Sequence, residues 1–151
     1  MINDKDDQTA VKISIELSPE QKEGYPINSE SMWFIPEGDT HRLINIPFFV
    51  DNLAMEDLVR LKECRNGYYK IDQIVSVSSN STLWIVLNKP PVGKDILEEI
   101  HKLGCGYEGG VFPGYFTVNV PGKIDINSVY AILDQAESNN VLLIDYPCIR
   151  Q

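Results

Sequence analysis

Histidine, the side chain most often used for acid–base catalysis, is scarce in this sequence. The chain has two histidines, His41 and His101. His101 and Cys105 are four residues apart, and one turn of helix brings side chains at that spacing together. A thiol beside an imidazole is a common nucleophilic pair. Gly104, however, is a typical residue to end a helix. We therefore expect the helix to stop between the two residues and the pair not to form.

Metal and nucleotide sites lack a recognisable pattern. The cysteines are odd in number and have no C-x-x-C spacing, which argues against a disulfide framework and a cysteine zinc site. The stretch GCGYEGGVFPGY at 104–115 lacks the lysine and hydroxyl residue of a phosphate-binding P-loop. We expect no metal, no cofactor and no catalytic residue. An enzyme would have to use scattered polar residues such as His41, Asp57 and Asn80. For His41, next to Arg42, a solvated strand end is the simpler interpretation.

The net charge of the chain limits the kinds of molecule that it is expected to bind. The 151 residues carry a formal net charge of −9, with a pI of about 4.6. Nucleic-acid affinity comes mainly from Lys and Arg that displace counterions, so a nucleic-acid partner is not expected. An acidic surface keeps a protein soluble, or it docks on a basic partner. The polar N-terminus is unlike a signal peptide and no apolar run could cross a bilayer, so we expect a cytoplasmic protein without membrane contact.

The first half of the chain is rich in strand patterns. Residues 1–10 are expected to be a disordered tail, and residues 11–80 a β-rich part. Strands are predicted at 11–17, 31–35 and 41–50, where Pro47 implies an edge or a bulge. Two further runs flank Asn66–Gly67, a strong hairpin signal. This part therefore predicts a small antiparallel barrel or a curled sheet.

The second half, residues 81–151, alternates strands and helices. Strands are predicted at 82–88, within 104–111, at 115–120 and at 141–149, with helices at 92–104 and from Asp125, a plausible N-cap, to 140. Gly109 and Gly110 are expected to permit a bend, and Pro113–Gly114 a turn. This order is that of a ferredoxin-like βαββαβ half, with two helices on one face of an antiparallel sheet. The predicted class is α+β, and the two halves could form one joint compact unit.

Two short segments carry a family resemblance. NIPFF at 45–49, which follows a strand containing Trp33, and SNSTLW at 79–84 resemble the two boxes of a family of small bacterial proteins described only as a domain of unknown function. The family's second box usually has glycine where Ser79 stands and often a basic residue where Trp84 stands. The resemblance spans roughly 32–150. It implies a bacterial source and brings no catalytic residue to this chain.

The resemblance leads to the main functional hypothesis. Small, acidic, cytosolic bacterial proteins without an evident site are often immunity proteins, which neutralise toxins by protein–protein contact. We hypothesise that this chain binds a basic toxin, plausibly a nuclease. The candidate contacts are acids on the two predicted helices and aromatics of the glycine-rich stretch: Asp95, Glu98, Glu99, Asp134, Glu137, Tyr107 and Phe112. The alternatives are a small-molecule-binding regulatory module, by analogy with other ferredoxin-like domains, and the enzyme considered above.

Overall fold

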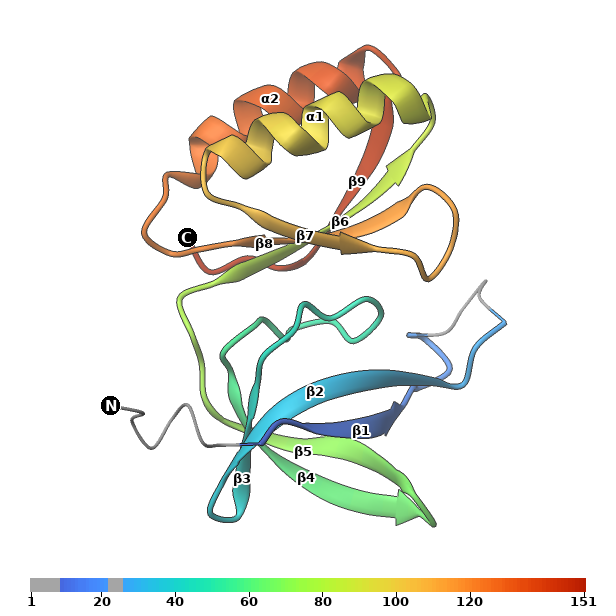
Figure 1. Ribbon diagram of the computed structural model, residues 1–151, viewed down its shortest axis with the longest axis vertical. Helices are drawn as coiled ribbons and strands as arrows, with labels where there is room; N and C mark the ends of the chain where they lie inside the picture. The colour runs from blue at the N-terminus through green and yellow to red at the C-terminus, as the bar shows by residue number, and fades with distance from the viewer. Residues whose placement is uncertain (1–8, 22–25) are drawn as a thin grey trace. The chain divides into compact units, whose positions relative to one another are not determined.

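The computed structural model describes residues 9–21 and 26–151, which form two compact units (Figure 1). The first unit holds the described residues up to Asp51 together with Met55–Ser78, and the second holds Asn52–Ala54 and Ser79–Gln151. The fold is mixed α+β. Most of the predicted tail, residues 1–8, lies outside the described residues. No helix in the described ranges has the length and apolar character needed to cross a membrane.

The first unit is a closed barrel of five strands. They are β1 (Val11–Glu16), β2 (Ser29–Glu37), β3 (Thr40–Leu43), β4 (Leu58–Arg65) and β5 (Tyr68–Ser76). Neighbouring strands pair antiparallel except β1 and β5, whose short parallel pairing closes the barrel. Alternate apolar residues of these strands are buried, among them Ile15, Phe34 and Val59. The first two predicted strands and the hairpin around Asn66–Gly67 are confirmed.

The predicted strand at 41–50 is wrong beyond Leu43, where β3 ends. The cause is Glu30 of β2, whose side chain is buried. Its carboxylate accepts the backbone N–H of Phe48 at 2.7 Å and that of Phe49 at 2.9 Å. A side chain thus satisfies donors that a neighbouring strand would otherwise satisfy. The apolar run can therefore fold as a loop with its side chains still buried.

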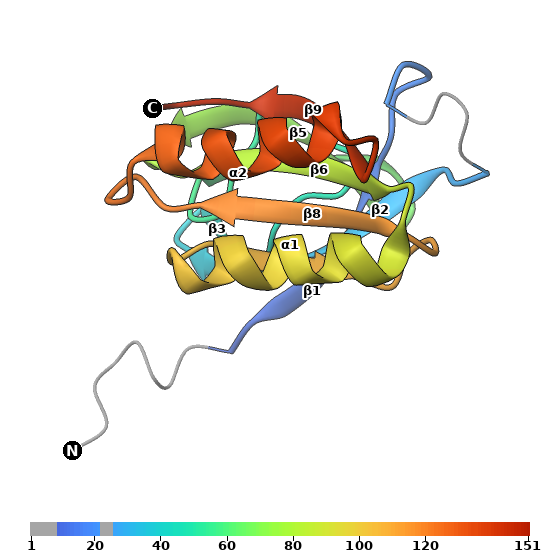
Figure 2. The same cartoon turned by 90° about the horizontal axis from the view of Figure 1, so that it is seen from above.

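The second unit is a four-stranded antiparallel sheet covered on one face by two helices (Figure 2). Its elements are β6 (Ser81–Leu87), α1 (Pro90–Lys102), β7 (Gly106–Gly109), β8 (Tyr115–Val120), α2 (Ile126–Ser138) and β9 (Leu142–Cys148). The sheet order is β7-β8-β6-β9, so β7 and β9 are the edge strands. All six elements follow the predicted sequence of strands and helices.

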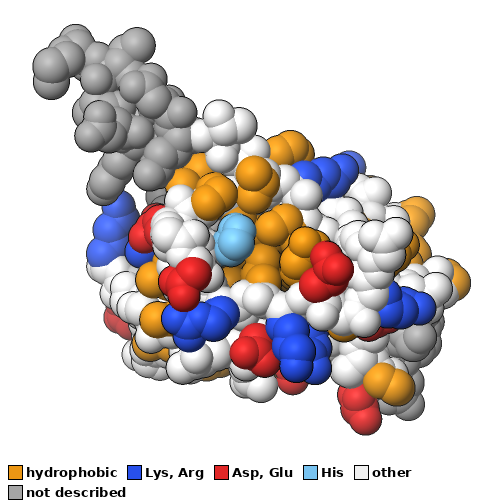
Figure 3. All heavy atoms as spheres, turned by 90° about the horizontal axis from the view of Figure 1, so that it is seen from below, with side chains coloured by type: hydrophobic (Ala, Val, Ile, Leu, Met, Phe, Trp, Pro, Cys, Tyr) orange, Lys and Arg blue, Asp and Glu red, His pale blue; other side chains and the backbone are white. Residues whose placement is uncertain are grey.

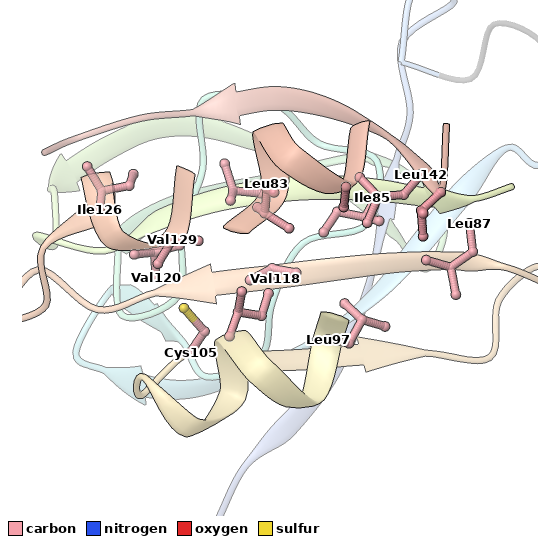
Figure 4. Packing of buried hydrophobic residues seen from close by; sticks show 14 residues of the cluster. Leu83, Ile85, Leu87, Leu97, Cys105, Val118, Val120, Ile126, Val129 and Leu142 are labelled. Atoms are coloured by element: carbon pink, nitrogen blue, oxygen red, sulfur yellow. The ribbon is translucent and has the colours of Figure 1, made fainter. Parts of the chain in front are cut away.

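The core of this unit lies between sheet and helices, as the alternation of β6 requires. One face of β6 and β8 meets the apolar stripes of both helices (Figure 4). The central residues are Leu83, Ile85, Val118, Leu97, Ile100, Val129 and Leu133. Apolar burial of this kind stabilises a domain by about 25 cal/mol per Å² removed from water. The helices are therefore held by their stripes and leave their polar faces outside.

The helix ends follow local sequence signals. The Asp125 side chain accepts the Asn127 N–H at 3.0 Å, which confirms it as the N-cap of α2. Gly104 follows the end of α1 with φ +115°, as expected of a terminating glycine. The predicted start of α1 is two residues late, because Pro90 and Pro91 lie within the helix. Proline fits the first turn, where its missing N–H has no helical partner.

Three residues from the loop after β3 belong to the second unit. The Asn52 N–H donates to the carbonyl of Pro147 at 2.9 Å. The Thr82 hydroxyl donates to the carbonyl of Leu53 at 3.0 Å. Asn52 has φ +57°, a conformation that asparagine tolerates better than most residues. Hydrogen bonds thus tie this segment to β9 and β6.

Gly109 has a different role from the one predicted. It lies in β7 rather than at a bend, and a Cβ placed there would lie 2.5 Å from Cε1 of Phe116. The positive φ values belong instead to Gly110 (+101°) and Gly114 (+76°). Gly109 therefore gives the Phe116 ring room to lie on the strand, while Gly110 and Gly114 supply the turn conformations.

Gly109→Ala should destabilise the protein because the Phe116 ring must move. We expect a loss of about 1–3 kcal/mol in the free energy of unfolding, measured by urea denaturation. Gly106→Ala is the matched control, because a Cβ at this other end of β7 meets no atom within 4 Å. Equal effects of the two substitutions would contradict the role given to Gly109.

Glu30→Gln should also destabilise the protein, because an amide offers one acceptor oxygen to two backbone donors. Leaving one buried N–H unpaired costs about 1–3 kcal/mol. The same denaturation measurement with Glu99→Gln, at an exposed helix position, controls for loss of charge alone. A Glu30→Gln protein as stable as this control would show that the carboxylate does not hold the loop.

Candidate functional site

The five predicted acidic contact residues all lie exposed on the helices. On α1, Asp95, Glu98 and Glu99 are interspersed with the basic residues Lys94 and Lys102. On the α2 side the charge is of one sign. From 124 to 149 the sequence contains four acids and no Lys or Arg: the acids are Asp125, Asp134, Glu137 and Asp145. The α2 side is therefore the more acidic part of this layer.

Two tyrosines accompany the acids of α2. Tyr130, Asp134 and Glu137 are spaced i, i+4 and i+7, so they share one face of the helix. The Tyr130 ring meets the ring of Tyr146 on β9 edge to face, with centroids 5.9 Å apart and planes at 81°. Tyr146 is 44% exposed. We call these four residues, Tyr130, Asp134, Glu137 and Tyr146, the tyrosine–carboxylate patch.

The patch keeps its phenols protonated. Partial burial raises the pKa of Tyr130, and the charge of Asp134 raises it further. The pKa of Tyr146 is raised by burial and then by Asp134 and Glu137. Among the described residues, no Lys or Arg forms an ion pair with either acid. The patch thus offers hydroxyl donors and negative charge on an apolar base of two rings.

Glu137 has a second contact. Its Oε2 accepts the backbone N–H of Ile144 at 3.2 Å. Because β9 is an edge strand, this N–H has no neighbouring strand to bond. Glu137 thereby ties α2 to β9 and fixes the position of the patch. Asp134 has no such structural contact among those of the described residues, so it is the better residue to alter in a binding test.

The aromatics predicted as contacts lie elsewhere. Tyr107 is half-buried, and its ring packs edge to face on those of His101 and Phe116. Its hydroxyl donates to Glu98, a hydrogen bond that raises the pKa of Tyr107. Phe112 is half-buried in the turn after β7. Neither residue joins the patch, and a partner-binding role for them stays a prediction.

His101 and Cys105 do not form a nucleophilic pair. The His101 Nδ1 lies 2.8 Å from the backbone carbonyl of Cys105, where its N–H can donate. The thiol is buried in the core, and burial raises its pKa to about 11. A thiol with that pKa carries almost no thiolate at neutral pH. This outcome agrees with the expectation from Gly104.

The polar residues considered for catalysis have separate environments. Asp57 is fully buried and accepts the Ser78 N–H at 2.8 Å, whereas Asn80 is buried in the other unit. His41 is half-buried in β3, with its ring edge-on to Phe34 at 5.9 Å. His41 thus lies near the start of its strand, as predicted, and its ring is only partly exposed to solvent. Across the described ranges, no group of three or more His, Cys, Asp or Glu side chains could hold a metal ion.

Sequence reasoning missed Tyr130 and Tyr146. Tyr130 was detectable from its helical spacing to Asp134 and Glu137, and the 26-residue run from 124 to 149 without a basic residue marked the region. Tyr146 was not detectable in this way. It meets Tyr130 only because β9 lies beside α2 in the folded unit.

Asp134→Asn should lower the pKa of both Tyr130 and Tyr146, because the carboxylate's charge opposes phenol ionisation. Burial should still hold both above the ordinary value. NMR titration of the tyrosine ring carbons measures each phenol separately, and Asp95→Asn on α1 is the control. Unchanged tyrosine titrations would contradict the electrostatic coupling within the patch.

Comparison with known proteins places the chain in a family. A hypothetical protein from Neisseria gonorrhoeae has a similar solved structure, with a TM-score of 0.73 and 22% sequence identity over 95% of this chain and 96% of that one. At this identity the likeness shows the fold alone. No curated protein matches the sequence. The family model of a domain of unknown function (DUF4265) matches residues 30–144, which include both NIPFF and SNSTLW. The resemblance drawn from these segments is thus confirmed, and the chain belongs to the DUF4265 family.

Proposed function

We propose that this protein is a cytoplasmic immunity-type protein, which neutralises a basic toxin, plausibly a nuclease, by binding it rather than by catalysis. The observation that carries the proposal is the tyrosine–carboxylate patch. Two adjoining phenol rings and two carboxylates lie together on the α2 side, in a sequence stretch without Lys or Arg. The chain's net charge of −9 favours the same kind of partner.

The chemistry of the patch suits a basic protein surface. Tyrosine is enriched among the residues that dominate binding energy, because it combines a large apolar ring with a hydroxyl. Carboxylates beside such rings pair with Arg or Lys and attract them over the width of a Debye length. A nuclease must hold phosphates and so presents basic side chains at its active site. An acidic partner can compete for the same side chains.

We also propose that the second unit has a ferredoxin-like arrangement. The strand order β7-β8-β6-β9 with both helices on one face supports a ferredoxin-like arrangement. This scaffold would present α2 and β9 side by side. The acids of α1 share their helix with Lys94 and Lys102, so we assign the main contact to α2.

The test measures rescue and binding together. The protein encoded by the neighbouring gene is expressed with and without the full chain, and growth is recorded. Binding of the two purified proteins is then measured by calorimetry. Asp134→Lys should weaken binding about tenfold or more, a free-energy change of about 1.4 kcal/mol, and it should reduce rescue. Tyr146→Ser should also weaken binding, because it removes an apolar anchor.

Asp95→Lys is the matched control, because it makes the same charge change at an exposed position on the other helix. Thermal unfolding of each variant identifies any loss of folding. Absence of binding by the unaltered chain would overturn the immunity proposal. Equal weakening by Asp134→Lys and Asp95→Lys would overturn the assignment of the contact to the patch.

A further inference from the structure

The barrel contains a hollow that the proposed toxin contact does not use. It has a volume of about 390 Å³, and its lining residues are Lys12, Ile13, Ser14, His41, Leu61, Gly67 and Tyr69. Figure 3 shows a face of the molecule on which hydrophobic side chains lie above and to the right of a histidine side chain, with acidic side chains on its other side. The volume lies within the usual range for small-molecule pockets, about 300–1,000 Å³. Pockets at the mouths of barrels are frequent ligand sites.

The strands that line the hollow pair with one another incompletely. β1 pairs with β2 along its whole length but with β5 only at Ser14 and Ile15. β4 pairs with β3 only at Leu58 and Val59, although it continues to Arg65. The β4–β5 hairpin therefore extends past its neighbours on both sides. The hollow lies beside these short pairings, since Ser14 and Tyr69 take part in the β1–β5 pairing and His41 in the β3–β4 pairing.

His41 supplies a polar atom that needs a partner. Its Nδ1 is buried, and it has no hydrogen-bond partner among the described residues. The half-buried ring lies edge-on to that of Phe34, with centroids 5.9 Å apart. An unpaired buried nitrogen costs about 1–3 kcal/mol, so native structures rarely keep one without a reason. Because the imidazole lines the hollow, a turn of its ring would bring this nitrogen to a ligand there.

The remaining lining groups indicate the charge of that ligand. Lys12 is the one Lys or Arg among the lining residues, and no Asp or Glu accompanies it there. Its ammonium lies 6.0 Å from the centroid of the Trp33 ring. The Tyr69 phenol hydrogen-bonds to Glu63, which raises its pKa and occupies its donor. Ile13 and Leu61 provide apolar walls.

We propose that the hollow binds a small organic monocarboxylate, with its carboxylate at Lys12 and its apolar body between Ile13 and Leu61. The His41 imidazole is its hydrogen-bond partner. A single cation suits a singly charged carboxylate better than a phosphate, which usually takes several cationic or N–H donors. This site lies wholly in the barrel unit and does not depend on the toxin-binding proposal.

The test uses benzoate as the probe and the full chain labelled at its methyl groups. Benzoate should shift the NMR resonances of the Ile13 and Leu61 methyl groups in a saturable manner. Benzamide has the same ring without the charge and should bind more weakly, and so should inorganic phosphate, which lacks the apolar body. Lys12→Met should weaken benzoate binding about three- to fivefold, the usual effect of one exposed ionic contact.

Lys70→Met is the matched control, because it removes an exposed lysine of the same barrel outside the hollow. His41→Phe keeps an aromatic ring and removes the ring nitrogens, and it should abolish the benzoate shifts. Thermal unfolding checks that this variant folds. Equal binding of benzoate and benzamide, binding of phosphate as tight as that of benzoate, or no saturable shift at Ile13 and Leu61 would each overturn the proposal.

Discussion

The buried carboxylate of Glu30 is the constraint on which the first unit depends. A single side chain of β2 holds the two backbone N–H groups of Phe48 and Phe49. Without it, an apolar run of high strand propensity would have unpaired donors and would tend to join the sheet. With it, β3 ends at Leu43 and the residues that follow form a loop. The family match begins at this glutamate.

Most of the fold was predictable because its signals are local. The Asn66–Gly67 turn, the Asp125 cap and the apolar stripes of the helices act within a few residues of each element. The predictions were wrong where a residue distant in sequence determines the local structure. The run at 41–50 has the pattern of a strand, but Glu30 lies far from it in sequence. The sequence around Gly109 predicts a bend. The Phe116 ring lies beside Gly109 because of the register between β7 and β8, which the sequence pattern does not give.

The candidate surfaces were predictable to a smaller extent. Charge and helical spacing identified Asp134 and Glu137 as exposed, since those properties belong to one helix. The patch also needs Tyr146 from another element, and the hollow needs residues of four strands. His41 is an example of a residue whose surroundings the sequence does not predict. Its sequence position next to Arg42 suggests a solvated strand end, whereas closure of the barrel buries its Nδ1.

Asn52–Ala54 affect how this chain can be divided in the laboratory. A recombinant fragment that starts at Ser79 contains every helix and strand of the second unit, but it lacks the carbonyl of Leu53 that the Thr82 hydroxyl bonds. It also lacks the N–H that the Pro147 carbonyl accepts. A fragment that ends at Asp51 loses the β4–β5 hairpin. The chain passes between the units more than once, so no single cut yields both intact.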